Sequence, residues 1–169
     1  MAKGKVLGIK EGQIFNSCLD LSRNSVHQYQ NKNGKSKTAP GIVTDRDGVA
    51  SSVLLNGGYV DDEDNCDQII YTGSGGQDDR KIQISDQVIE GRQGRNNLGL
   101  INAYNLETPL RLIRGYKHKS EYAPSRGYRY DGLFYIKKVW WDQSIHGPVI
   151  IRFELIHEDR FQGKGNIRL

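Results

Sequence analysis

The chain has 169 residues, a length that favours a single domain with a core of its own. Hydrophobic residues make up 36% of it, and no apolar run approaches the roughly 20 residues that span a bilayer, so we expect no membrane partner. The N-terminal residues hold no apolar segment typical of a secretion signal, and the two cysteines are Cys18 and Cys66. We therefore expect an intracellular protein with two reduced thiols.

Charge is distributed unevenly along the chain. The formal net charge is +4, yet residues 47–79 contain eight acidic residues and no Lys or Arg, which leaves 24 basic and 12 acidic residues elsewhere. A basic surface of this kind suits a polyanion, because Lys and Arg displace counterions from phosphates. From charge alone, an ordinary solvated surface explains the pattern equally well.

The first predicted elements are a short helix, a loop and two strands. Residues 16–24 (NSCLDLSRN) begin with capping residues and predict the helix. Residues 28–38 are polar, basic and glycine-containing, which predicts an exposed loop. Residues 51–56 (SSVLLN) and 67–73 (DQIIYTG) fit strands that enter and leave an acidic loop.

The second half of the chain predicts one more helix and three more strands. Leu98, Ile101 and Tyr104 recur at three-residue spacing within residues 95–106, as on one face of a helix. The strands are predicted at 109–115 (PLRLIRG), 132–141 (GLFYIKKVWW) and 149–156 (VIIRFELI).

These elements predict an α+β fold that is mostly β, with a closed or strongly twisted sheet. Residues 1–157 are predicted to form the domain. Residues 158–169 (EDRFQGKGNIRL) are predicted to be a tail or the start of a linker.

Common enzyme and metal-site motifs are missing. The sequence has no P-loop, no zinc-deaminase pattern and no paired-histidine zinc motif, and its four histidines are scattered. The acidic run at 61–67 lacks the spacing of an EF-hand loop. The GSGG run at 73–76 fits a tight turn better than a phosphate cradle. We therefore expect no cofactor, no metal and no catalytic residue.

Residues 57–76 (GGYVDDEDNCDQIIYTGSGG) have the composition of a pocket for a nucleobase. Tyr59 and Tyr71 are able to stack on a flat ring from two sides, which gains roughly 1–3 kcal/mol per base. An Asp between them would accept a hydrogen bond from the amino group of cytosine and would repel the carbonyl of thymine. On these residues alone, a pair of core tyrosines beside an exposed acidic loop is the simpler interpretation.

Two motifs together resemble a known family. Residues 57–76 resemble the signature of the SRA (SET- and RING-associated, or YDG) domain, and residues 122–136 (YAPSRGYRYDGLFYI) contain its name-giving Tyr-Asp-Gly at 130–132. The resemblance runs from about residue 8 to about residue 155. Further matching segments follow in the family's order at 8–15, 25–27, 41–56 and 109–115.

The resemblance implies a twisted PUA-like β-barrel with helices packed outside. It implies binding to double-stranded DNA that carries 5-methylcytosine, with the modified base rotated out of the duplex. The chain looks most like the microbial branch, in which such domains are joined to HNH nuclease domains, so a fused or associated nuclease is an expected partner. This implies a cytoplasmic protein in a bacterium or a nuclear one in a eukaryote.

The same resemblance assigns individual residues. Tyr59 and Tyr71 match the stacking tyrosines, and Asp62 matches the carboxylate that reads the cytosine edge. Asn56 stands where the family has a small apolar residue, at the rim of the pocket. The remaining pocket residues are Gly58, Thr72 and Gly73, and the family's two DNA-contacting loops match the segments with Thr38, Ala39 and Pro40 and with Arg80 and Lys81. On charge alone, further candidates for phosphate contact are Lys35, Lys37, Arg111, Arg114, Lys117 and Lys119.

A methyl group adds little to binding, because burying it gains only about 0.8 kcal/mol. We therefore expect a modest preference for modified over plain cytosine and a stronger rejection of thymine. Two other functions stay open at this point. One is an enzyme that excises the base, with Asp62 activating water, or cuts modified DNA, and the other is a PUA-like module that binds RNA or protein.

Overall fold

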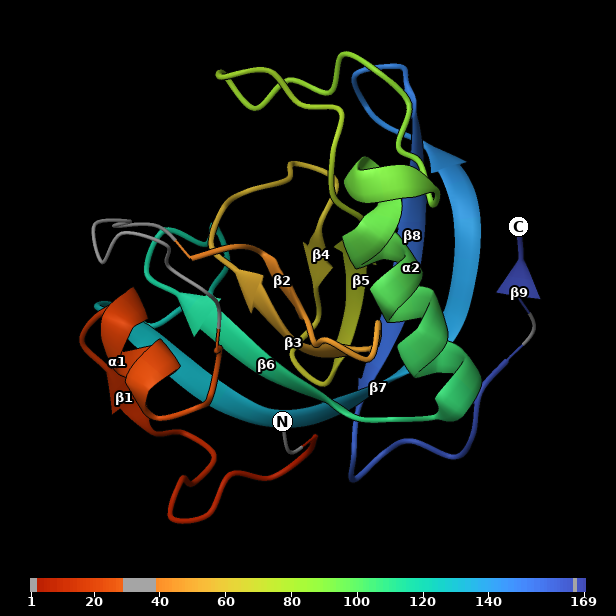
Figure 1. The fold of residues 1–169 in the computed structure, drawn as a ribbon. Coiled ribbons are helices and arrows are strands. Elements are labelled where there is room, and N and C mark those ends of the chain that lie inside the picture. Colours follow the sequence, from red (N-terminus) through yellow and green to blue (C-terminus); the bar gives the residue numbers. More distant parts are fainter. Residues whose placement is uncertain (1–2, 29–38, 166) are drawn as a thin grey trace.

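The computed structural model describes residues 3–28, 39–165 and 167–169. In these residues, nine strands form one sheet and two helices pack against it, so the fold is α+β and predominantly β, as predicted (Figure 1). The helices are α1 (Cys18–Arg23) and α2 (Gly91–Leu106). The strands are β1 (Ile14–Phe15), β2 (Ile42–Thr44), β3 (Ala50–Leu55), β4 (Glu63–Asp64), β5 (Gln68–Thr72), β6 (Leu110–Gly115), β7 (Tyr128–Gln143), β8 (Val149–His157) and β9 (Ile167–Arg168).

The sheet has the order β2-β3-β6-β7-β8-β5-β4, and β1 and β9 both pair with the long strand β7. Strand β3 runs parallel to β6 and β9 runs parallel to β7, whereas the other pairs are antiparallel. The hydroxyl of Tyr71 in β5 donates to the carbonyl of Gly41, next to β2, at 2.9 Å. The curled sheet therefore brings two distant strands together, as expected for a strongly twisted, barrel-like sheet.

The predicted strands are confirmed. They form because their apolar residues pack into two separate cores. All six residues of β3 are buried. Val53 and Leu55 face the main core, whereas Leu54 faces a second, smaller one. Alternating side chains point to opposite faces of a strand, so a strand with a core on each side is apolar throughout.

Helix α1 closes the smaller core. The hydroxyl of Ser17 accepts a hydrogen bond from the backbone N–H of Asp20 and caps the helix, as the capping residues predicted. Leu21 is fully buried, and the thiol of Cys18 contacts the hydroxyl of Tyr128 at 3.0 Å. Both cysteines are free thiols in the structure.

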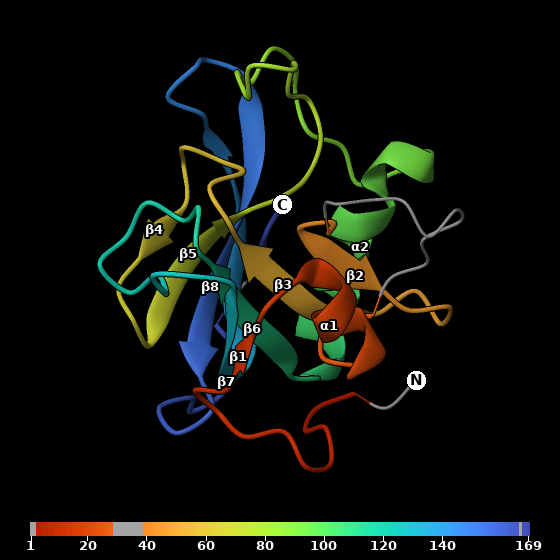
Figure 2. The same ribbon diagram turned by 90° about the vertical axis from the view of Figure 1, so that its left-hand side faces the viewer.

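Helix α2 closes the main core, and Figure 2 shows both helices on the same side of strands β5 and β8. The predicted helix is confirmed, but the predicted face is partly wrong, because Leu98 is 43% exposed. The buried positions of α2 are Gly94, Asn97, Gly99, Leu100, Ile101, Ala103 and Tyr104. Asn97 can be buried because its amide nitrogen donates to the carbonyls of Ser74 and Val88. The hydrophobic pattern of the sequence does not reveal these hydrogen bonds.

Residues that follow the expected domain end pack back onto the sheet. The ring of Phe161 stacks on Tyr135 of β7, with ring centroids 4.7 Å apart. The hydroxyl of Tyr104 in α2 donates to the carbonyl of Gly165. No helix among the described residues has both the length and the apolar character needed to cross a bilayer.

Candidate functional site

Five of the predicted pocket residues line one cavity of about 260 Å³. They are Asn56, Gly58, Tyr59, Asp62 and Tyr71. The cavity lies between the curled sheet and the loop that joins β3 to β4. Its remaining walls come from Ala39, Gly41, Leu54, Lys81, Tyr116, Lys117 and Tyr128.

The two tyrosine rings are held by hydrogen bonds at their hydroxyl ends. The hydroxyl of Tyr59 accepts from the backbone N–H of Gly75 at 2.8 Å, and that of Tyr71 donates to the carbonyl of Gly41 at 2.9 Å. Burial raises the pKa of both phenols, so both stay protonated at neutral pH. The rings therefore have fixed orientations before any ligand arrives, which lowers the entropy cost of binding.

Asp62 is the acid of the cavity. Burial raises its pKa to about 7, against the opposing effect of the Thr72 backbone N–H, which donates to Oδ1 of Asp62 at 2.7 Å. This carboxyl group therefore exists in both protonation states near neutral pH. It is positioned to accept a hydrogen bond or, when protonated, also to donate one.

Thr72 and Gly73 lie behind the cavity and are not among its lining residues. The GSGG run forms a turn whose N–H groups are already bonded. The N–H of Gly73 donates to the carbonyl of Ile151 and that of Ser74 to Oδ1 of Asn97, at 2.8 and 2.7 Å. These donors hold the turn in place and cannot also bind a phosphate.

The loop after β5 is tied to the rim of the cavity. Nζ of Lys81 donates to the carbonyl of Gly57 at 3.1 Å, and Nε2 of Gln77 donates to the carbonyl of Gly58 at 2.9 Å. Figure 1 shows this loop rising at the top of the molecule beside the turn between β7 and β8. Arg80 and Lys81 are both exposed, so they remain candidates for DNA contact.

Arg114 instead belongs to a buried network behind the cavity, and we withdraw it from the DNA-contact candidates. Its side chain is 3% exposed and makes two bonds to Asp64 and one to Asp131, each at 2.8 Å. Burial would raise the pKa of Asp64, but hydrogen bonds from Arg114 and His118 outweigh it and hold that pKa well below its usual range. The network anchors the loop that carries Asp62, because Asp64 lies two residues further on.

Arg111 is also removed from the DNA-contact candidates. Its side chain is fully buried and donates to the carbonyls of Val26 and Gly4, at 2.8 and 3.1 Å. Both arginines lie within β6, where the sheet covers them. The alternating pattern of residues 109–115 predicts a polar face on this strand, and both faces of β6 are buried in the folded chain.

The Tyr-Asp-Gly motif has a structural role. Tyr130 is buried in the smaller core and Asp131 pairs with Arg114. Gly132 has a φ of +93°, and a Cβ there would lie 2.7 Å from Oε2 of Glu11. This backbone conformation and this close approach require glycine.

The other DNA-contact candidates lie around the cavity or outside the described residues. Lys35, Lys37 and Thr38 lie outside them. Ala39 and Lys117 line the cavity. Pro40 and Lys119 are exposed, and they follow Ala39 and Lys117 by one and two residues. Gly41, Leu54, Tyr116 and Tyr128 also line the cavity and were not predicted from the sequence. They come from four separate segments that meet at the cavity only in the folded chain.

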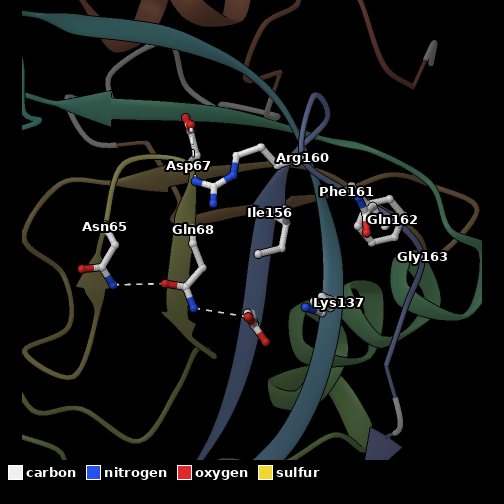
Figure 3. A pocket seen from close by; sticks show the side chains of 10 residues that line it. Asn65, Asp67, Gln68, Lys137, Ile156, Arg160, Phe161, Gln162 and Gly163 are labelled. Carbon is white, nitrogen blue, oxygen red and sulfur yellow. Dashed lines mark hydrogen bonds and ion pairs between the residues drawn. The ribbon is translucent and has the colours of Figure 1, made fainter.

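A second, larger cavity of about 610 Å³ opens between β5, β7, β8 and the segment after β8 (Figure 3). Asn65, Gln68 and Glu154 form a hydrogen-bonded chain along it. None of the predicted site residues lines it. Among the residues that the structure describes, no cluster of His, Cys, Asp and Glu side chains has an arrangement suited to a metal ion.

Comparison with known proteins identifies the family. The model of the SAD/SRA domain matches residues 2–160. The chain is 32% identical over 164 residues to the histone-lysine N-methyltransferase family member SUVH9 of Arabidopsis thaliana, which covers 97% of this chain and 24% of that protein. It is 42% identical over 105 residues to the E3 ubiquitin-protein ligase ORTHRUS 5 of the same plant, covering 58% of this chain and 16% of that protein. The chain thus spans about a quarter or less of these relatives.

Solved structures agree with this match. A modification-dependent TagI restriction endonuclease has a TM-score of 0.79 and 33% identity, over 91% of this chain and 51% of that one. The SRA domain of SUVH5 in complex with methylated CHH DNA has a TM-score of 0.71 and 28% identity, over 99% of both chains. The same domain bound to fully hydroxymethylated CG DNA has a TM-score of 0.74 and 29% identity, over 98% of this chain and 99% of that one. The chain belongs to the SAD/SRA domain family.

Proposed function

We propose that this chain binds double-stranded DNA that carries 5-methylcytosine and holds the modified base, rotated out of the duplex, in the cavity between Tyr59 and Tyr71. The observation that carries the proposal is that both tyrosines and Asp62 line one cavity of about 260 Å³. That volume lies below the roughly 300–1,000 Å³ of sites for drug-sized ligands, so it suits a single ring. Relatives solved with methylated and hydroxymethylated DNA support this ligand class.

The energy of base extrusion is offset by stacking and hydrogen bonding. Taking a base out of the duplex costs a few kcal/mol, and stacking on an aromatic ring recovers roughly 1–3 kcal/mol per base. The tethered hydroxyls of Tyr59 and Tyr71 favour this exchange, because the rings do not need to be ordered during binding.

Asp62 discriminates cytosine from thymine. Cytosine presents an amino donor next to the ring acceptor N3, whereas thymine presents a carbonyl and an N–H in the same places. A protonated carboxyl matches the cytosine pattern with both of its oxygens, and an ionised one accepts from the amino group alone. The raised pKa of Asp62, about 7, makes the protonated form accessible. The 5-methyl group contributes about 0.8 kcal/mol, so selectivity for it is modest.

Lys81 and Lys117 supply positive charge beside the cavity. Both are exposed, both line the cavity, and they come from the loops after β5 and β6. The phosphates that flank an extruded nucleotide stay outside the pocket that takes its base. We therefore assign these two lysines to phosphate contacts.

We further propose that the chain is the specificity domain of a modification-dependent restriction endonuclease. The similarity to the TagI restriction endonuclease, of which this chain covers 51%, supports the proposal. The chain itself then binds DNA without cutting it, and a fused or associated nuclease domain supplies the cleavage. Incubation of the full-length gene product with methylated and unmethylated plasmid should give cleavage of the methylated plasmid alone.

Tyr59→Ala tests the pocket. The variant should bind a duplex with one 5-methylcytosine at least about tenfold more weakly, because a base stack is lost. A fluorescent cytosine analogue at the target position should brighten with the wild-type protein and stay quenched with the variant.

Tyr135→Ala is the matched control, because Tyr135 lies on β7 and stacks on Phe161 away from the cavity. It should bind like the wild-type protein. If Tyr59→Ala folds and also binds like the wild-type protein, the pocket assignment is wrong. Release of free base during the incubation would favour a glycosylase instead.

A further inference from the structure

Asn56 lies in the wall of the cavity with one end of its amide unbonded among the described residues. It follows directly after β3 and lines the same cavity as Asp62, Tyr59 and Tyr71. A Cβ on Gly115, at the end of β6, would lie 2.2 Å from Oδ1 of Asn56 and 2.5 Å from its Cγ. The amide therefore lies flat against Gly115, where only glycine leaves room for it.

The orientation of this amide is determined by its neighbour. Oδ1 of Asn56 accepts from the backbone N–H of Lys117 at 2.9 Å. A backbone N–H only donates, so the oxygen must face it and Nδ2 must face the other way. Nδ2 makes no hydrogen bond with the residues that the structure describes.

Other polar groups of the cavity have different roles. The hydroxyls of Tyr59 and Tyr71 are bonded to backbone groups. One oxygen of the Asp62 carboxyl already accepts from the Thr72 N–H. Asn56 thus adds a neutral, oriented amide to a lining whose other polar side chains are tyrosines, Asp62 and the two lysines Lys81 and Lys117. A donor of this kind recognises an oxygen on the bound ring.

We propose that Asn56 is a specificity-determining residue whose Nδ2 donates to an oxygen of the extruded pyrimidine, away from the amino group that Asp62 reads. The proposal rests on the function proposed above. Two oxygens have the required chemistry: the ring carbonyl O2, which every cytosine carries, and the hydroxyl of a 5-hydroxymethyl group.

Asn56→Asp is the sharpest variant, because it is isosteric and keeps an oxygen for the Lys117 N–H while it replaces the donor by an acceptor. Asn56→Ala removes the donor without adding charge. Affinity is measured for duplexes with one cytosine, one 5-methylcytosine or one 5-hydroxymethylcytosine, and for a duplex of A·T pairs that lacks the target base. Thermal unfolding checks that each variant folds, and Asn56→Ala carries the test if Asn56→Asp does not fold.

Both variants should weaken binding by roughly tenfold. An equal loss for all three cytosines identifies O2 as the acceptor. A loss confined to the hydroxymethylated duplex identifies the 5-hydroxyl. Binding like the wild-type protein to all three, or an equal loss on the A·T duplex, would overturn the proposal.

Tyr59→Ala, measured alongside, separates this inference from the proposed function. If Tyr59→Ala weakens methylated-DNA binding and the Asn56 variants do not, the pocket assignment is supported and only the proposed role of Asn56 is wrong. If Tyr59→Ala has no effect, the pocket itself is wrong.

Discussion

The two cavities of this domain differ in kind more than in size. The larger, of about 610 Å³, is lined by polar side chains that bond to one another, such as Gln68 and Glu154 (Figure 3). The smaller, of about 260 Å³, is lined by four tyrosines, one acid, one amide and two lysines, among other residues. In the smaller cavity, backbone groups hold the hydroxyls of Tyr59 and Tyr71, one oxygen of Asp62 and the amide oxygen of Asn56. The tyrosine ring faces and the amide NH₂ of Asn56 make no such contact with the described residues.

This difference teaches that volume alone does not mark a binding site. A flat base needs two apolar walls at a fixed separation and a few oriented polar groups. In the smaller cavity, a buried ionic network anchors the loop that carries Asp62, and backbone groups hold the hydroxyls of Tyr59 and Tyr71. The larger cavity is bordered by exposed charges such as Arg160 and Asp67, whose charged atoms lie 3.8 Å apart. Three matched pairs of substitutions test this contrast.

The largest expected effect is on stability, from Arg114→Ala behind the smaller cavity. Removing this arginine takes three hydrogen bonds from the buried carboxylates, leaving Asp64 with His118 and Asp131 with Arg129, which should lower the free energy of unfolding by about 3–5 kcal/mol. Arg160→Ala beside the larger cavity removes an ion pair between side chains that are 66% and 45% exposed, and should cost less than about 1 kcal/mol. Urea denaturation measures both, and similar losses would refute the contrast.

A smaller, pH-dependent effect is expected from Asp62→Asn. The pKa of Asp62 is about 7 in the folded chain against an ordinary value of 3.8, so between about pH 4 and 7 the folded protein keeps a proton that the unfolded chain releases. The free energy of unfolding therefore falls as pH rises through this window. Asp62→Asn removes this loss, so its stability relative to the wild-type protein should rise by about 2–3 kcal/mol from about pH 5 to about pH 8.

Asp67→Asn is the counterpart at the larger cavity, because its side chain is 45% exposed. It should bind cytosine and thymine duplexes like the wild-type protein, because it lies outside the smaller cavity. Asp62→Asn should also bind thymine and cytosine duplexes more equally, because the Thr72 N–H holds the amide oxygen and leaves a donor, the amide NH₂, in place of the second carboxyl oxygen. If the stability difference between Asp62→Asn and the wild-type protein does not change with pH, the carboxyl of Asp62 in the wild-type protein ionises as readily in the folded chain as in the unfolded chain.

The smallest effect is expected from Lys81→Met beside the smaller cavity. If Lys81 contacts one phosphate, the slope of log K against log salt should become shallower by about 1, with a several-fold loss of affinity at low salt. Lys137→Met at the larger cavity should leave the slope unchanged. Equal effects of the two lysines would mean that DNA attraction comes from the overall charge of the surface.

Much of this fold could be predicted because its strands and helices carry local signals. Apolar and β-branched runs marked β3, β5, β6, β7 and β8, and a capping serine marked α1. The prediction for Leu98 was wrong, because the helix instead turns Asn97 inward to bond to the backbone at Ser74 and Val88. A buried amide with distant partners has no signature in a hydrophobic pattern.

The pocket was predicted from one continuous motif, and that motif covers only one side of it. Tyr59, Asp62 and Tyr71 come from residues 57–76, which also provide the rim glycines. Gly41, Leu54 and Tyr128 join them from strands that are neighbours only in the folded sheet. Arg114 was assigned to DNA because a charge on a strand gives no sign of whether its partner is a phosphate or a buried carboxylate.

The sequence by itself determined both helices, five of the nine strands, the family and the three side chains around which the proposed pocket is built, because each depends on local patterns or contiguous motifs. Only the tertiary structure decided which charges are buried, which hydroxyls are tethered and which way the Asn56 amide faces. These depend on contacts between segments many residues apart, such as Asp64 with Arg114 and Asn56 with Lys117. Packing of the curled sheet, and no local rule, brings those segments together.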